Sequence, residues 1–190
     1  MVLVCTFADR LTIRGFLVRA MTAPSEPNWT EDMQEIHHFA GNDNQWASLK
    51  ELLDRGVPAD AECGEDHTTP LQLAAANGAV KNIKLLIQHK ATVDQADKHG
   101  STALHNAASR RHAETAQILL AAKADPNKRN GFGWSSLMYA ARNGDVQTVK
   151  VLLDAKADTT LEVNGGESFS ALDIARGHER KDVIALLEQQ

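Results

Sequence analysis

Eight histidines give this 190-residue chain its widest scope for chemistry, because imidazole binds metals and exchanges protons near neutral pH. A helix would place the adjacent His37 and His38 on different faces. Five others are scattered, without the short spacings of zinc ligands: His67, His89, His99, His112 and His178. We therefore expect no metal site.

The sequence contains no phosphate-binding glycine loop, no nucleophile elbow and no pair of acids in a predicted cleft. Gly165-Gly166 indicates a flexible insertion in a hairpin rather than a phosphate cradle. Cys5 and Cys63 form no CxxC pair and no disulfide framework, which favours a reducing compartment. We expect no enzymatic activity and no cofactor. A degenerate enzyme or metal protein is the alternative from another class, and metal analysis of the purified protein would test it.

The charge of the chain argues against two classes of partner. Residues 1–20 carry three arginines and one aspartate, a net charge of +2, which leaves −7 of the total of −5 on residues 21–190. Binding to a phosphate backbone needs clustered lysines and arginines on a basic surface. No apolar run approaches the length of a membrane span. We expect neither a nucleic acid nor a membrane as partner.

The elements that must position these side chains are short helix pairs that recur along the chain. In residues 100–127, Leu104 and Ala107 give a first helix an apolar stripe, and Leu119 and Leu120 give one to a second helix. Helices this short cannot bury such stripes against each other alone, so the pattern requires neighbours of its own kind. Similar segments stand 33 residues away in both directions, at residues 69–75 and 135–141.

The period predicts a repeat domain over residues 30–190, after a leader and linker over residues 1–29. Its five units are expected at residues 30–60, 61–95, 96–128, 129–161 and 162–190. The first and last are atypical and more polar, as the end units of a repeat stack must be. Leu172 follows Leu137 by 35 residues, because the loop over residues 163–168 is longer than its counterparts.

Residues 1–20 differ in composition from the rest of the chain. Arg10, Arg14 and Arg19 lie in an apolar stretch with one acid, which is typical of a mitochondrial presequence. A disordered leader and an upstream extension of a chain that starts at Met21 are the other two interpretations. A secretory signal fits less well, because the positive charge lies within and after the apolar run. N-terminal sequencing of the native protein would separate these interpretations.

The repeated segments resemble the signature of the ankyrin repeat family, Gly-x-Thr-Pro-Leu-His-x-Ala-Ala. Residues 69–75 read TPLQLAA and lack only the histidine, and residues 100–108 read GSTALHNAA and lack only the proline. Residues 133–141 read GWSSLMYAA and match more weakly. The resemblance implies an all-α repeat solenoid, a stack of helix-turn-helix units with projecting β-hairpin loops. It also implies that His105 bonds neighbouring turns as a structural residue.

In this family the hairpins and first helices form a concave face that binds other proteins. Carried over residue by residue, the face comprises Glu65, Asp66, Ala76 and Asn77 in the second unit, Lys98, His99, Ser101, Ser109 and Arg110 in the third, and Gly131, Phe132, Trp134, Arg142 and Asn143 in the fourth. Aromatic and arginine side chains dominate interface energies, so Phe132, Trp134, Arg110 and Arg142 are the expected hot spots. Trp134 has an alternative role, in which its ring packs against its own hairpin.

Two further features depend on the resemblance. Arg111 stands where the neighbouring units have Gly78 and Gly144, so it either adopts a positive φ or ends its helix differently. Leu119, Asp125 and Asn127 resemble the pattern at which hairpin asparagines of animal ankyrin repeats are hydroxylated, although Pro126 replaces the usual aliphatic residue. Intact mass after incubation with such a hydroxylase would test Asn127.

The sequence as a whole predicts a monomeric, non-catalytic scaffold or adaptor that binds a protein partner through its concave face. The alternative is a regulatory or inhibitory subunit that occludes a partner enzyme, and only the partner's activity separates the two. We expect a cytoplasmic protein. The nucleus is a second compartment, and the mitochondrion a third if residues 1–20 act as a targeting signal.

Overall fold

The computed structural model describes residues 29–163 and 168–190. The predicted leader, apart from residue 29, and the Gly165-Gly166 pair lie outside these ranges. Ten α-helices and one short 3-10 helix occur in the described residues: α1 (Trp29–Ala40), η2 (Asp43–Gln45), α2 (Trp46–Asp54), α3 (Pro70–Asn77), α4 (Val80–Gln88), α5 (Ala103–Ser109), α6 (Ala113–Ala121), α7 (Ser136–Asn143), α8 (Val146–Asp154), α9 (Ala171–Gly177) and α10 (Lys181–Leu187). None of them is long and apolar enough to cross a membrane.

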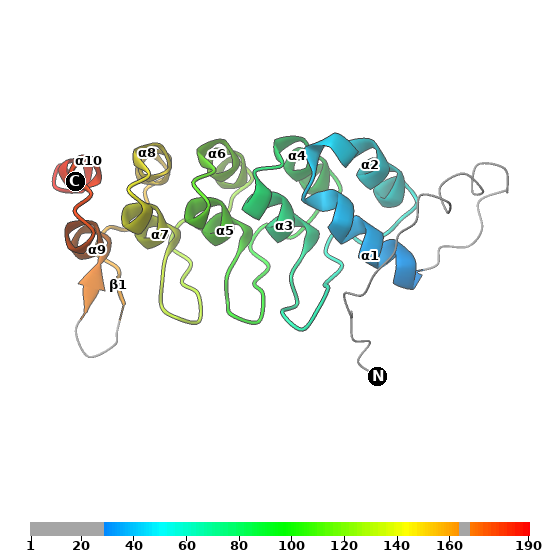
Figure 1. Ribbon diagram of the computed structural model, residues 1–190, viewed down its shortest axis with the longest axis horizontal. Coiled ribbons are helices and arrows are strands. Elements are labelled where there is room, and N and C mark those ends of the chain that lie inside the picture. Colours follow the sequence, from blue (N-terminus) through cyan, green and yellow to red (C-terminus); the bar gives the residue numbers. More distant parts are fainter. Residues whose placement is uncertain (1–28, 164–167) are drawn as a thin grey trace, which may run out of the picture.

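The helices form two parallel rows, and the connecting hairpins project beyond one of them (Figure 1). The first helices of the pairs, α1, α3, α5, α7 and α9, lie between the row of second helices and the hairpins. The last hairpin contains two strands, β1 (Glu162–Val163) and β2 (Phe169–Ser170), which pair antiparallel with Glu162 opposite Ser170. The predicted all-α stack of helix pairs is confirmed.

Equivalent apolar residues of successive repeats form one continuous core. Leu71, Leu104 and Leu137 occupy the same position in three repeats, and each is at most 1% exposed. Pairs of alanines on α3, α5 and α7, such as Ala107 and Ala108, are equally buried. Because alanine has a small side chain, these inner helices can pack closely side by side, and the core runs the length of the stack.

Four of the inner helices, α3, α5, α7 and α9, follow a hydroxyl residue that caps them. Thr69, Thr102, Ser135 and Ser170 are the N-caps of α3, α5, α7 and α9, all in extended conformation. In α3 the Thr69 hydroxyl accepts the Gln72 N–H while the Gln72 side chain accepts the Thr69 N–H, so two otherwise unsatisfied backbone donors are bonded. Pro70 follows at the first helical position, where its missing N–H is not needed.

The inner helices of the second and fourth repeats end at left-handed glycines. Gly78 has φ 67° and Gly144 has φ 70°, and Arg111 takes the same conformation with φ 66° in the third repeat. A non-glycine residue pays a steric penalty in this region. The arginine is held by one hydrogen bond, from its guanidinium Nη2 to the Asn143 carbonyl at 3.0 Å.

Replacing Arg111 by glycine should therefore stabilise the protein by roughly 0.5 kcal/mol. The substitution removes the steric penalty of the positive φ. This gain is larger than the two losses, which are one exposed hydrogen bond and the greater entropy that glycine gives the unfolded chain. Urea unfolding followed by circular dichroism measures the change. Arg110→Gly is the matched control, because Arg110 has φ −104° and should lose stability on the same substitution. A loss of stability in Arg111→Gly would show that the side-chain bond outweighs the backbone strain.

Candidate protein-binding face

Backbone hydrogen bonds join the hairpin tips of three consecutive repeats into one rim. The Lys98 N–H donates to the Asp66 carbonyl at 2.9 Å, and the Gly131 N–H donates to the His99 carbonyl at 2.7 Å. A Cβ atom on Gly100 would lie 2.8 Å from the Gly131 nitrogen, so only glycine allows the two hairpins to approach so closely. The rim carries most of the hairpin residues that the sequence predicts for the binding face.

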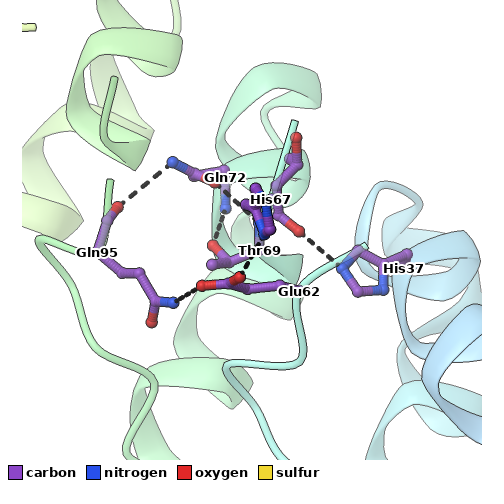
Figure 2. A network of polar contacts seen from close by, with 7 residues as sticks. His37, Glu62, His67, Thr69, Gln72 and Gln95 are labelled. Atoms are coloured by element: carbon purple, nitrogen blue, oxygen red, sulfur yellow. Dashed lines mark hydrogen bonds and ion pairs between the residues drawn. The ribbon is translucent and has the colours of Figure 1, made fainter. Parts of the chain in front are cut away.

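The hairpin of the second repeat, which carries Glu65 and Asp66 and is called the second hairpin below, is also held from both sides by side chains (Figure 2). His37 Nε2, on α1, donates to the Thr68 carbonyl at 3.0 Å, while Gln72 Nε2 donates to the Ser101 carbonyl at 2.6 Å. Gln95 and His67 both bond the Glu62 carboxylate, at 2.7 and 2.9 Å. The hairpin that presents Glu65 and Asp66 is therefore fixed between the first and third repeats.

His105 performs in the third repeat the task that Gln72 performs in the second. Its Nδ1 accepts the Thr102 N–H at 3.1 Å, and its Nε2 donates to the Trp134 carbonyl at 3.0 Å. This pattern requires the neutral ring, because a protonated Nδ1 could not accept. Burial of the ring, which is 2% exposed, lowers the pKa of His105 below its ordinary value of 6.5. The structural role predicted for His105 is confirmed.

The charged residues predicted in the second and third repeats pair with each other. Lys98 forms an ion pair with Asp66, and His99 Nε2 lies 3.8 Å from the same carboxylate. The hydrogen bond from Lys98 lowers the pKa of Asp66, and the pKa of Lys98 is raised for the same reason. Glu65 is exposed and has no hydrogen-bond or ion-pair partner among the described residues. At this end of the face the charges of Asp66 and Lys98 therefore largely cancel, while the Glu65 carboxylate beside them forms no ion pair in the described residues.

Aromatic side chains gather on the fourth repeat. Phe132 is 65% exposed and stacks on the His99 ring, with centroids 6.1 Å apart and planes at 20°. Trp134 is half-buried and packs on Tyr139 of its own repeat at 5.0 Å, and the Arg142 guanidinium lies 5.9 Å from the Trp134 ring. Both contacts are with helix α7 of the same repeat rather than with the hairpin that the alternative role names, and Trp134 is still partly exposed.

Several predicted face residues have structural partners instead of open positions. The Asn143 amide donates to the Ser109 carbonyl at 2.8 Å, and the Asn77 amide donates to the Leu73 carbonyl at 2.9 Å. Ser101 is half-buried, and its hydroxyl lies 3.4 Å from the Asn130 amide. The side chain of Arg110, in contrast, is exposed and makes no hydrogen bond or ion pair within the described part of the chain. It is the most available cation of the predicted set.

The structure adds two residues to this face that the sequence prediction did not include. Tyr139 lies under Trp134, and its hydroxyl accepts the Asn130 amide at 2.9 Å. Phe169, on β2, is 45% exposed. The signal for Phe169 was present in the sequence, because the 35-residue step from Leu137 to Leu172 also carries Trp134 onto Phe169.

Two family models match this chain. One, described as ankyrin repeats (3 copies), matches residues 36–130, which is half of the chain, and the other, described as ankyrin repeats (many copies), matches residues 111–153. The chain belongs to the ankyrin repeat family. Ankyrin repeats are generally protein–protein interaction modules and are typically non-catalytic.

A curated protein is similar to part of this chain. Serine/threonine-protein kinase 12 of Arabidopsis thaliana is 35% identical over 83 residues, which are 41% of this chain and 18% of the kinase. The chain therefore spans less than a fifth of the length of that relative. The similarity concerns a short shared segment.

The side chain predicted for hydroxylation has a structural role in the ankyrin array. Asn127 Oδ1 accepts the N–H of Asp158, which belongs to the next repeat, at 2.7 Å. In the same way the carboxylate of Asp94, in the preceding repeat, accepts the N–H of Asp125 at 3.1 Å. These bonds tie the start of each hairpin to the next repeat. Asn127 is exposed, and its modification stays a prediction.

The described residues contain no group of three histidine, cysteine or acidic side chains that could hold a metal ion. A hollow of about 360 Å³ lies at the turn ends of the last repeats, lined by Arg111, Asn143, Gly144, Glu179, Arg180, Lys181, Asp182 and Val183. Its lining includes two acids, Glu179 and Asp182, and three basic residues, Arg111, Arg180 and Lys181.

Replacing His105 by glutamine should make the free energy of unfolding less dependent on pH. Since the pKa of His105 is lowered by folding, the unfolded chain takes up this proton first as the pH falls through about 6.5. The stability contributed by the neutral ring is fully present above that pH and is lost below it. Gln72 shows that glutamine can make the same bonds at this position.

Urea unfolding at pH 8 and pH 5.5 measures the effect, with the exposed His178→Gln as control. The wild type and the control should lose more stability between the two pH values than His105→Gln does. An equal loss in all three proteins would contradict the assignment of a neutral His105.

Proposed function

We propose that this ankyrin array is a non-catalytic scaffold or adaptor that binds a protein partner through the concave face formed by its hairpins and inner helices. The observation that carries the proposal is the group of Phe132, Trp134, Arg110 and Arg142, which are exposed or half-buried on one side of the stack. Aromatic and arginine side chains at the centre of an interface supply most of its binding energy.

The rigidity of the face supports the proposal. The hairpins are joined by backbone hydrogen bonds through Lys98 and Gly131, and Gln72 and His105 anchor them to the inner helices. A face that is already ordered loses little conformational entropy on binding, so more of the contact energy becomes affinity. We further propose that the protein acts as a monomer in the cytoplasm, in keeping with its cysteine content.

The double variant Trp134→Ala/Arg110→Ala tests the concave face. We expect it to reduce recovery of the physiological partner from a cell extract by roughly tenfold or more, because both substitutions remove hot-spot side chains. The matched control is Gln117→Ala/Lys150→Ala, which alters exposed residues of the outer helices α6 and α8 and should leave recovery unchanged. Circular dichroism must show that both variants are folded. Equal recovery of the partner by the two variants would refute the assignment of the concave face.

A further inference from the structure

We infer that the third, fourth and fifth repeats recognise an extended partner segment in which a carboxylate side chain stands next to an aromatic or aliphatic one. In this site the carboxylate binds Arg110 and Arg142, and the apolar side chain packs on Phe132, Trp134 and Phe169. The inference rests on the proposed function and narrows it to one chemical class of partner.

The first support is a set of arginines without acidic partners. In residues 29–163 and 168–190, the ion pairs that involve arginine are Arg55 with Asp32 and Arg176 with Glu188. The arginines of the third to fifth repeats that form none are Arg110, Arg111, Arg129, Arg142 and Arg180. Residues 21–190 carry a net charge of −7. Even so, five guanidinium groups of the third to fifth repeats form no ion pair with an acidic side chain in the described residues.

Three of these arginines are already occupied by backbone carbonyls. Arg111 donates to Asn143, Arg129 donates to Gly133 and Glu162, and Arg180 donates to Arg142. Glu179 and Asp182 line the same hollow as Arg111, Arg180 and Lys181, so two acids face three basic residues there. The Arg110 guanidinium has no partner among the described residues, and the Arg142 guanidinium contacts the Trp134 ring there. These two guanidinium groups can therefore donate hydrogen bonds to a carboxylate, in the bidentate geometry that arginine favours.

Arg110 and Arg142 belong to neighbouring helix ends. Arg142 is in the last turn of α7, and Arg110 caps the end of α5. The Asn143 amide reaches from α7 to the Ser109 carbonyl at 2.8 Å, which holds the two ends together. Their positive charges add, so this spot attracts an anionic side chain on an otherwise acidic protein.

The second support is the apolar surface beside these cations. Phe169 follows Trp134 in repeat register, and it lies opposite Val163 in the β1–β2 pair. Val163 in turn lies close to Gly133, since a Cβ on that glycine would be 3.9 Å from Val163 Cγ1. Phe169 at 45% and Phe132 at 65% exposure therefore stand on adjacent hairpins. Exposed rings on adjacent hairpins offer apolar surface on which an apolar side chain of a partner can pack.

The opposite end of the face selects against a polyanion. Glu62, Glu65 and Asp66 are exposed on the second hairpin. Among the described residues Glu62 pairs with His67, Asp66 pairs with Lys98 and lies near His99, and Glu65 forms no ion pair. A nucleic acid laid along the rim would meet these acids. A peptide with one or two carboxylates beside an apolar side chain meets the arginines and rings without this repulsion.

Selection of random linear peptides displayed on phage, against the immobilised full chain, tests the inference. We expect the selected peptides to carry Asp or Glu within two positions of an aromatic or aliphatic residue. A synthetic peptide from the selection should bind Arg110→Glu/Arg142→Glu at least roughly thirtyfold more weakly than wild type in fluorescence anisotropy. Lys84→Glu/Lys150→Glu makes the same change in net charge on the outer helices α4 and α8, and it should change the affinity by less than about threefold.

Three results separate the inference from the proposed function. Selected peptides without acidic residues, or unchanged binding to Arg110→Glu/Arg142→Glu, would overturn the inference. If Trp134→Ala still weakened the binding of the selected peptides, the concave face would remain the binding site and the proposed function would stand. Binding that is insensitive to the Trp134 and the arginine variants alike would overturn both.

Discussion

A pair of seven- to nine-residue helices cannot form a core alone, so each repeat depends on its neighbours. Hydrogen bonds from side chains of one repeat to the backbone of an adjacent one fix how the repeats stack. At the hairpin side, Gln72 and His105 each cap their own helix and reach the following hairpin. At the turn side, the Asn143 amide and the Arg180 guanidinium bond the carbonyls that end the preceding inner helices. Both edges of each inner helix thus depend on the next repeat, so the stack acts as one unit.

The C-terminal repeats solve the same problem with different residues. Met138 occupies the position of His105 and has no N–H to donate to the next hairpin. Arg129 supplies this link, from its Nη2 to the Glu162 carbonyl at 2.7 Å. A structural demand for long donors thus accounts for part of the arginine content at this end. Arg110 and Arg142 are exceptions, since within the described residues their guanidinium groups bond no backbone carbonyl, and we propose that they serve binding of a partner instead.

The face that results is asymmetric along the stack. On the second and third hairpins Asp66, Lys98 and His99 pair among themselves, so their charges are largely spent within the protein. On the fourth and fifth hairpins rings are exposed beside unpaired guanidinium groups. A partner that binds as we propose would gain more contact energy at the fourth and fifth hairpins. It would displace no internal ion pair there and would cover solvent-exposed apolar surface.

The sequence by itself determined the helix pairs, their period and the buried stripes, because equivalent residues such as Leu71, Leu104 and Leu137 recur at fixed steps and apolar periodicity is a local signal. The concave-face positions are a prediction that the resemblance to the ankyrin family places on the repeat register. The tertiary structure decided which of those side chains are available: Asp66 is paired, Asn143 is used as a cap, and Arg110 is free of partners within the described residues. Such pairing depends on distances between residues about 32 to 34 positions apart, which stacking of the repeats alone creates.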